Sequence, residues 1–255
     1  MSLSPFETKL ILPFKKKSKQ IKIGFYQYGT HEVIDSSVCD VLQFPLNQTK
    51  EIIRKELDIH GISIYNEKLH KGFLRGIIVR SSRSNGETLV GFVTKRGEFP
   101  QSFIEKTAEK IIKTKIKLVG IGQNINSKKT NVILGTNTRT LWGNNYIEEE
   151  IGPIKFRLSL PSFFQVNSLQ AKKLYELVEN WIGLNGGLVI DAYSGVGTIA
   201  LWLARKGRQV IGIEKFKNAT EDAKVNAKLN NVESCRFETG TVENRIKNLG
   251  SDSPI

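Results

Sequence analysis

The chain has 255 residues and a mass of 28.7 kDa; 39% of its residues are hydrophobic, 25% are charged, and the formal net charge is +13. This composition is typical of a soluble globular protein with one large domain or two ordinary ones. The two cysteines exclude a disulfide framework and predict a reducing, cytoplasmic setting. No apolar run approaches the ~20 residues of a membrane span, so we expect no contact with a membrane.

The positive charge is concentrated in the first part of the chain. Residues 1–160 carry 26 Lys and Arg against 15 Asp and Glu, a net of +11, whereas residues 161–255 carry 12 against 10, a net of +2. A basic part joined to a nearly neutral part predicts that the first part contacts a polyanion. The alternative is that its lysines only solvate the surface.

Residues 1–160 are predicted to form an α+β domain with a mostly antiparallel sheet. Alternation of apolar and polar residues predicts paired strands at 9–14 with 21–26, 73–79 with 89–94, and 117–124 with 130–134. Apolar residues at helical spacing predict helices over 46–59 and 102–113. A further hairpin over 142–156, with Gly152-Pro153 as its turn, ends this domain.

Residues 161–255 follow a different pattern, in which helices and strands alternate across short loops. The predicted order is a helix beginning near Asn167 or Ser168, a strand at 188–190, a helix at 198–205, a strand at 209–213, a helix at 218–230 and a strand at 235–238. Such alternation is typical of α/β proteins and predicts a parallel, doubly wound, Rossmann-like sheet.

The most informative stretch, Asp191-Ala192-Tyr193-Ser194-Gly195-Val196-Gly197-Thr198, joins the first strand of this sheet to its helix. Gly195 and Gly197 allow the backbone to approach a ligand closely, and the following helix presents free N–H groups there. Asp191 is placed to act on a ligand's amino or hydroxyl groups. Glu214 ends the next strand, where a carboxylate can accept hydrogen bonds from both hydroxyls of an adenosine ribose. The stretch therefore predicts an adenosyl cofactor site.

A second cofactor fits the same residues. Gly195-x-Gly197-x-x-Ala200 satisfies the fingerprint of dinucleotide-binding proteins, with Glu214 at a suitable distance, so an NAD-dependent oxidoreductase is the rival interpretation. Asp191 argues against it, because a carboxylate repels a pyrophosphate and attracts the ammonium group of a methionine. A doubly wound domain that binds no cofactor is the remaining alternative.

The Asp191–Thr198 stretch and the upstream Ser162-Phe163-Phe164-Gln165-Val166-Asn167 resemble the RNA 5-methyluridine (uracil-C5) methyltransferases, which use S-adenosylmethionine. The resemblance continues through residues 120–131 and 24–35, and it covers nearly all of residues 1–249. Each string is short, but their order and spacing together are specific to that family.

The resemblance implies a role for several residues. Gln165 is similar to the glutamine that lies beside the cofactor and the target base, Tyr193 to the aromatic residue of the cofactor loop, and Glu214 to the ribose-binding acid. Residues 1–160 would then contact RNA, either rRNA or tRNA. Residues 161–255 would be the first half of the methyltransferase domain.

The chemistry of that family uses parts that this chain does not contain. A cysteine thiolate adds to C6 of uracil, C5 then takes the methyl group, and a general base removes the C5 proton. In the family the cysteine, the base and an acid-Pro-Pro-Arg motif lie beyond the third strand, whereas this chain ends at Ile255 and has no Asp-Pro-Pro. The family's common N-terminal β-barrel is missing as well. We therefore expect an incomplete member that is inactive unless another polypeptide completes it.

Neither cysteine is expected to take part in catalysis. Cys235 opens a strand, does not match the family's nucleophile, and is interpreted as a buried structural thiol. Cys39 matches the last of four iron–sulfur cysteines in many members, but one thiolate cannot hold a cluster, so we expect no metal.

Two groups of lysines are candidates for contacts with RNA. They are Lys15, Lys16 and Lys17 in the first turn, and Lys128 with Lys129 further on. Such cations would contact phosphates and position RNA without reading its sequence. The alternative for each group is a solvated turn. A third hypothesis for the whole chain is a non-catalytic RNA-binding protein that keeps the fold without cofactor chemistry.

Overall fold

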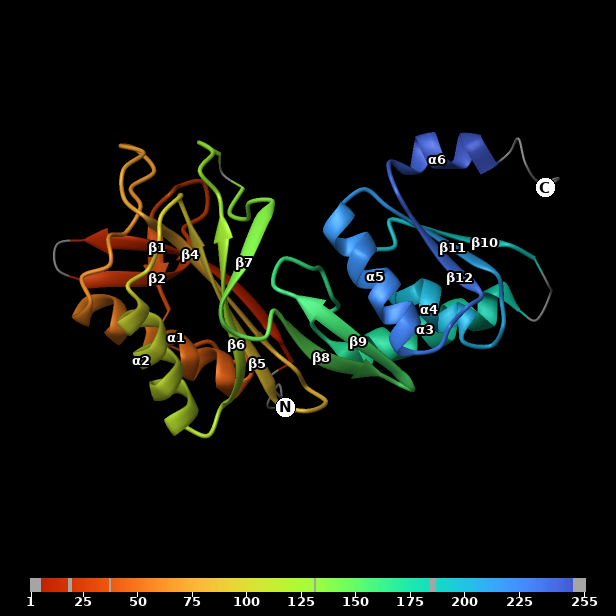
Figure 1. The fold of residues 1–255 in the computed structure, drawn as a ribbon, viewed down its shortest axis with the longest axis horizontal. Helices are drawn as coiled ribbons and strands as arrows, with labels where there is room; N and C mark the ends of the chain where they lie inside the picture. Colours follow the sequence, from red (N-terminus) through yellow and green to blue (C-terminus); the bar gives the residue numbers. More distant parts are fainter. Residues whose placement is uncertain (1–5, 18–19, 37, 131, 184–186, 250–255) are drawn as a thin grey trace. The chain divides into compact units, whose positions relative to one another are not determined.

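The computed structural model describes residues 6–17, 20–36, 38–130, 132–183 and 187–249, and Figure 1 draws them as a ribbon. The chain divides into two compact units, Met1–Ile147 and Glu148–Ile255. This division falls earlier than the predicted boundary after residue 160. The predicted fold class is confirmed, with an α+β unit followed by a Rossmann-like unit.

The first unit is built on a seven-stranded sheet in the order β3-β2-β1-β4-β5-β6-β7. The strands are β1 (Lys9–Lys17), β2 (Gln20–Tyr26), β3 (Val33–Asp35), β4 (Leu74–Ser81), β5 (Glu87–Thr94), β6 (Lys117–Ile125) and β7 (Asn137–Gly143). The predicted pairs β1–β2 and β4–β5 are confirmed and antiparallel. The strand β6 instead pairs in parallel with β5, because helix α2 (Gln101–Lys113) carries the chain back between them.

The core of this unit lies between the sheet and its two helices. Helix α1 (Phe44–Ile59) lies beside α2, and both pack against strands of the sheet (Figure 1). Ile53 of α1, Phe103 of α2 and Phe92 of β5 are fully buried there. Each such side chain contributes about 1.5–3 kcal/mol through removal of apolar surface from water.

The predicted strand at 130–134 is wrong at residues 130 and 132–134, and residue 131 lies outside the described residues. The antiparallel partner of β6 is β7, which begins at Asn137. Side chains of β6 and the residue after it hold the intervening loop: Asn126 Nδ2 donates to the carbonyl oxygens of Val132 at 2.8 Å and Ile133 at 3.1 Å, and Asn124 Oδ1 accepts from Gly135 N at 2.7 Å. Because side chains satisfy these backbone groups, the segment needs no neighbouring strand.

The second unit holds a hairpin and a three-stranded parallel sheet in the order β10-β11-β12. Its elements are β8 (Tyr146–Ile151), β9 (Ile154–Ser159), α3 (Ser168–Ile182), β10 (Val189–Ala192), α4 (Thr198–Ala204), β11 (Val210–Glu214), α5 (Lys217–Leu229), β12 (Cys235–Thr239) and α6 (Val242–Leu249). The predicted strands and helices of this part are confirmed, and Asn167 caps α3 by accepting from Gln170 N at 3.2 Å. Helix α6 was not predicted.

Helix α5 holds the edge of β9 through a ladder of polar side chains. Three backbone N–H groups of the strand donate to it: Lys155 to Asn230 at 2.8 Å, Arg157 to Asn226 at 2.7 Å, and Ser159 to Asp222 at 3.3 Å. Two residues of a strand advance about 6.6 Å and four residues of a helix advance about 6.0 Å, so the two repeats match. This ladder explains why the hairpin joins the second unit.

Asn226 is the buried centre of the ladder and also reaches the turn after β10, because its Nδ2 donates to the carbonyl oxygen of Val196 at 3.2 Å. We expect Asn226→Ala to lower the free energy of unfolding by about 2–3 kcal/mol, since two buried backbone groups lose their partners. Urea unfolding followed by tryptophan fluorescence measures this loss. Asn230→Ala is the matched control at the more exposed end of the ladder, with an expected loss of about 1 kcal/mol. Equal losses in the two variants would contradict the bridging role of Asn226.

Candidate functional site

The turn between β10 and α4 lies where two parallel strands end. Asp191 and Ala192 of β10 pair with Gly212 and Ile213 of β11, so the end of β10 lies beside the end of β11 at Glu214. Ligands of doubly wound sheets bind at this carboxyl edge. The structure thus brings together the two acids that the sequence predicted for one site.

The two glycines of the turn have different surroundings. Both adopt left-handed backbone conformations, with φ of 57° at Gly195 and 83° at Gly197. A Cβ on Gly197 would lie 2.6 Å from Phe237 Cζ, whereas a Cβ on Gly195 would have no atom within 4 Å. Gly197 is therefore required by packing, and Gly195 faces open space in which a ligand can approach the backbone.

Glu214 fixes the shape of this turn. The side chain is buried, Oε2 accepts from Gly195 N at 3.0 Å, and Oε1 accepts from Phe216 N at 2.8 Å. A carboxylate has about four acceptor positions, so each oxygen keeps one for a further donor. Glu214 can accept hydrogen bonds from a diol while it holds the loop in place.

Asp191, the second acid, is half-buried at the end of β10. Burial is the main cause that raises the pKa of Asp191 to about 6; the hydrogen bond from Ala200 N to Oδ2, at 2.9 Å, opposes this shift and the negative charge of Glu214 adds to it. A positively charged ligand beside such an acid would stabilise the ionised form of its carboxyl group.

The turn carries further groups that suit a ligand. Tyr193 has a φ of 63°, which is unusual for a residue other than glycine, and its ring is 70% exposed. Its hydroxyl donates to Glu243 Oε1 of α6 at 3.4 Å. The hydroxyl of Ser194 is buried and has no hydrogen-bond partner in the described part of the chain. A second aromatic ring, Phe216, is 69% exposed just after Glu214.

Sequence reasoning missed Phe216 and Glu243. The position of Phe216, two residues after the strand-ending acid, was a usable signal, because an aromatic residue there faces the same edge of the sheet. Glu243 had no such signal, since it lies on the unpredicted helix α6.

Gln165 is exposed on the loop between β9 and α3, and no hydrogen bond within the described residues joins it to Asp191, Tyr193 or Glu214. The same loop is anchored at Ser162, whose hydroxyl donates to Asp222. The cofactor role of Gln165 therefore stays a prediction.

The predicted RNA-binding lysines differ in whether they form an ion pair. Lys15 Nζ lies 2.6 Å from Glu32 Oε1, and Lys16 is exposed, while the side chain of Lys17 lies outside the described residues. Lys128 and Lys129 are exposed, and the structure records no ion pair for either within its described part.

The two cysteines have different surroundings. Burial, followed by the negative charge of Asp191, raises the pKa of Cys235 to about 12, which is the opposite of what a nucleophilic thiolate needs. Cys39 is half-buried, and its backbone N–H and carbonyl both bond to Asn47. Among the described residues, no three His, Cys, Asp or Glu side chains gather as metal ligands would.

A large cavity of the second unit, about 1130 Å³, opens elsewhere. It is lined by Leu188, Gln209 and Ser234, at the amino ends of the parallel strands, and by none of the predicted cofactor residues. The candidate cofactor residues lie instead at the carboxyl edge, with the two acids and the glycine turn. None of the helices in the described part of the chain has the length and apolar character of a transmembrane span.

Comparison with known proteins finds RNA methyltransferases. No protein-family model matches the chain. An uncharacterized RNA methyltransferase of Oceanobacillus iheyensis is 37% identical over 244 residues, covering 94% of this chain and 52% of that protein. One of Bacillus cereus is 40% identical over 242 residues, covering 93% and 52%. The chain therefore spans about half the length of the curated relatives it matches.

A solved structure of a methyltransferase is also similar to this chain. The tRNA (uracil-54, C5)-methyltransferase of Pyrococcus abyssi, in complex with S-adenosyl-L-homocysteine, matches with a TM-score of 0.76 and 28% identity. The match covers 92% of this chain and 55% of that one. Both units of the chain thus have a counterpart in one known protein.

Proposed function

We propose that this chain binds S-adenosylmethionine and acts in the methylation of uridine C5 in RNA. The chain belongs with the RNA methyltransferases over nearly its whole length. The observation that carries the proposal is the pair of acids at the carboxyl edge, Glu214 against the Gly195 amide and Asp191 beside it. A ribose diol and a methionine ammonium are the two groups that such a pair would recognise together. The proposal includes a cytoplasmic setting.

The residues present fit this cofactor. Glu214 would accept from the ribose hydroxyls, Asp191 would face the methionine ammonium, and the rings of Tyr193 and Phe216 would lie near the adenine. The buried hydroxyl of Ser194 supplies a further polar group at the turn. The bound cofactor would supply an electrophilic methyl group on a sulfonium, and these residues would bind and orient it.

The nicotinamide alternative has weaker support. A dinucleotide would bring its pyrophosphate to the glycine turn, where Asp191 and Glu214 already act on one another as like charges. A third negative group there would raise the electrostatic cost, whereas a cation lowers it. Calorimetry with S-adenosylhomocysteine and with NAD separates the two cofactors directly. Binding of NAD alone would overturn the proposal.

Glu214 offers a sharper test of the site. We expect Glu214→Gln to weaken binding of S-adenosylhomocysteine by about 10- to 100-fold, because hydrogen bonds to a charged acceptor are worth about 1.5–3 kcal/mol. Lys206→Gln, on the exposed surface between α4 and β11, is the control and should bind as the wild type does. Full affinity in Glu214→Gln would rule out its contact with the ribose.

The choice of uridine C5 rests on the motif resemblance and on a structure that is named for this reaction. That chemistry needs a thiolate, and the raised pKa of Cys235 argues against its use. We therefore propose that residues outside these 255, in a longer chain or in a completing polypeptide, supply the nucleophile. In support, β10 lies at the edge of the described sheet with Ile190 38% exposed, and Trp181 on α3 is 76% exposed.

Methyl transfer from labelled cofactor to rRNA or tRNA tests this last proposal. We expect the purified 255-residue chain to bind cofactor and RNA but to transfer no methyl group. Transfer at the rate of a longer relative would contradict the need for residues outside these 255. Salt-dependent RNA binding without cofactor binding would instead favour the non-catalytic RNA-binding alternative.

A further inference from the structure

We propose that one end of the first unit is a preformed binding face for a single-stranded loop of RNA, with Lys68, Lys128 and Lys129 on its phosphates and Tyr28 against a base. The proposal rests on the proposed function, because it takes RNA as the polyanion. We call this surface the loop face; it consists of residues 27–32, 66–71, 95–96 and 126–130.

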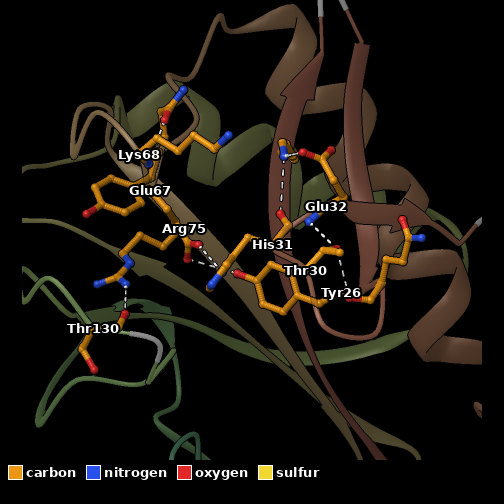
Figure 2. A network of polar contacts seen from close by, with 12 residues as sticks. Tyr26, Thr30, His31, Glu32, Glu67, Lys68, Arg75 and Thr130 are labelled. Carbon is orange, nitrogen blue, oxygen red and sulfur yellow. Dashed lines mark hydrogen bonds and ion pairs between the residues drawn. The ribbon is translucent and has the colours of Figure 1, made fainter.

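The loop face is organised around the buried guanidinium of Arg75, whose contact with Thr130 is drawn in Figure 2. Arg75 of β4 is 8% exposed. Its Nη1 donates to the carbonyl oxygens of Asn126 and Lys128, each at 2.9 Å, and its Nη2 donates to that of Thr130 at 2.9 Å. The guanidinium also lies over the ring of Tyr65, 4.8 Å from its centroid. Arg75 therefore holds the 126–130 loop beside the segment that follows Tyr65, and at least three of its five N–H donors are used within the protein.

A shared carboxylate joins the other two loops. Glu67 Oε1 accepts from the hydroxyl of Tyr26 at 3.1 Å, and Glu67 Oε2 lies 3.0 Å from His31 Nδ1 (Figure 2). Burial and the charge of Glu67 raise the pKa of Tyr26 to about 12, whereas the charge of Arg75 lowers it. Tyr26, Glu67 and Arg75 are thus close enough to act on one another, and three loops that are distant in sequence meet at one place.

The acidic side chains of the loop face form ion pairs, whereas most of its basic side chains have no recorded ion pair within the described residues. Glu32 pairs with Lys15 and Glu67 with His31. The exposed cations are Lys68, Lys71, Arg96, Lys128 and Lys129, and the structure records no ion pair for any of them within the described residues. A surface of this kind keeps an uncompensated positive potential that attracts phosphates.

The backbone that carries these cations is fixed before any ligand arrives. Lys128 N donates to Asn126 Oδ1 at 3.1 Å, and Arg96 N donates to Ser127 Oγ at 3.1 Å. Lys68 N donates to Asn66 Oδ1 at 3.0 Å. Because the loops are ordered by internal bonds, binding would have to immobilise only the lysine side chains.

An aromatic ring favours an unpaired RNA loop over a duplex. Tyr28 lies in the turn closed by the bond from Thr30 N to the Gln27 carbonyl, 3.0 Å, and its side chain is fully exposed. An exposed aromatic ring can stack on an unpaired base, and every base offers such a face. A base inside a duplex is already stacked and cannot reach it.

Fluorescence anisotropy with a labelled RNA hairpin, and with a blunt RNA duplex of the same length, tests the loop face over a range of salt concentrations. We expect Lys128→Gln/Lys129→Gln to weaken hairpin binding and to reduce the slope of log affinity against log salt by about 1.4, since each single-strand phosphate contact contributes about 0.7. Lys55→Gln/Lys106→Gln, exposed lysines on α1 and α2, changes the net charge equally and should keep the wild-type slope.

Tyr28 tests the stacking contact separately. Tyr28→Ala should weaken hairpin binding by about 5- to 150-fold, corresponding to about 1–3 kcal/mol for one stacked base, whereas Tyr28→Phe should keep it. An unchanged salt slope in Lys128→Gln/Lys129→Gln, an equal loss in the helix-lysine control, or tighter binding of the duplex would overturn the proposal.

Binding of S-adenosylhomocysteine to the wild-type chain is measured in parallel. If the chain binds RNA through these lysines but binds no cofactor, the proposed function fails and the loop face stands. If it binds cofactor and the lysine variants keep the wild-type salt slope, the loop face fails alone.

Discussion

Asp191→Asn is expected to weaken binding of S-adenosylhomocysteine by about 100-fold and, at the same time, to stabilise the protein. The loss of affinity follows from removing the charge that would face the methionine ammonium, since a partly buried ionic contact of this kind is worth about 3 kcal/mol. The gain in stability follows from the pKa of Asp191, about 6 against a value of 3.8 for the free group. Ionising this carboxyl in the folded protein therefore costs at most about 3 kcal/mol.

The sign of the pH dependence makes the test specific. Because the pKa of Asp191 is raised on folding, its stabilising contribution is fully present below pH 3.8 and is lost as the pH rises through about 6. Asparagine keeps an acceptor for Ala200 N and does not titrate. Thermal unfolding should therefore show Asp191→Asn more stable than the wild type at pH 8 and equal to it at pH 4.

Cofactor binding should follow the opposite course. The ammonium group needs an ionised carboxylate, so the affinity of the wild type for S-adenosylhomocysteine should be constant above pH 7 and fall as the pH drops below about 6. Calorimetry over this range measures it, and Asp191→Asn should show a flat profile. A wild-type affinity that does not change between pH 5 and pH 8 would contradict the contact.

Alanine at Gly197 and at Gly195 should have different consequences, although the substitution is the same and the sites are two residues apart. Gly197→Ala places a Cβ 2.6 Å from Phe237 Cζ and 3.2 Å from Ala223 Cβ, in a left-handed conformation. We expect it to lower the free energy of unfolding by about 2–5 kcal/mol, from backbone strain and overpacking together.

Gly195→Ala carries only the conformational cost, about 1–2 kcal/mol, because its Cβ meets no atom within 4 Å. The added methyl group instead occupies the space in which the cofactor would approach the Gly195 amide. We expect at least tenfold weaker binding of S-adenosylhomocysteine, or about 1.4 kcal/mol. Urea unfolding of both variants measures the stability losses, and calorimetry measures the binding of S-adenosylhomocysteine. A Gly195→Ala protein with wild-type affinity would show that the ligand binds elsewhere.

Local sequence signals were enough to select residues that lie together at one edge of the sheet. Strand ends, paired glycines and a following helix are all visible within a short stretch, so Asp191, Gly195, Gly197 and Glu214 were found, and the structure brings them to one edge. The individual binding roles remain predictions. Gln165 was chosen by resemblance alone, and no hydrogen bond within the described residues joins it to Asp191, Tyr193 or Glu214.

What the sequence could not predict depends on contacts between distant segments. The parallel pairing of β5 with β6 is decided by where α2 packs, which no strand pattern encodes. The segment 130–134 has the composition of a strand, but the side-chain amide of Asn126 donates to the carbonyl oxygens of Val132 and Ile133. The loop face likewise depends on Arg75, whose three carbonyl partners lie 51 to 55 positions further along the chain.

The matched repeats of α5 and β9 also restrict how this protein can change length. The bonded residues are 63 to 75 positions apart in the chain, yet the N–H groups of β9 must stay in register with the side chains that accept from them. One residue inserted into β9 would turn the N–H groups beyond it to the opposite side of the strand, and one inserted into α5 would rotate the following side chains by about 100°. Insertions and deletions among homologous chains should therefore spare both segments and collect in the loops around them.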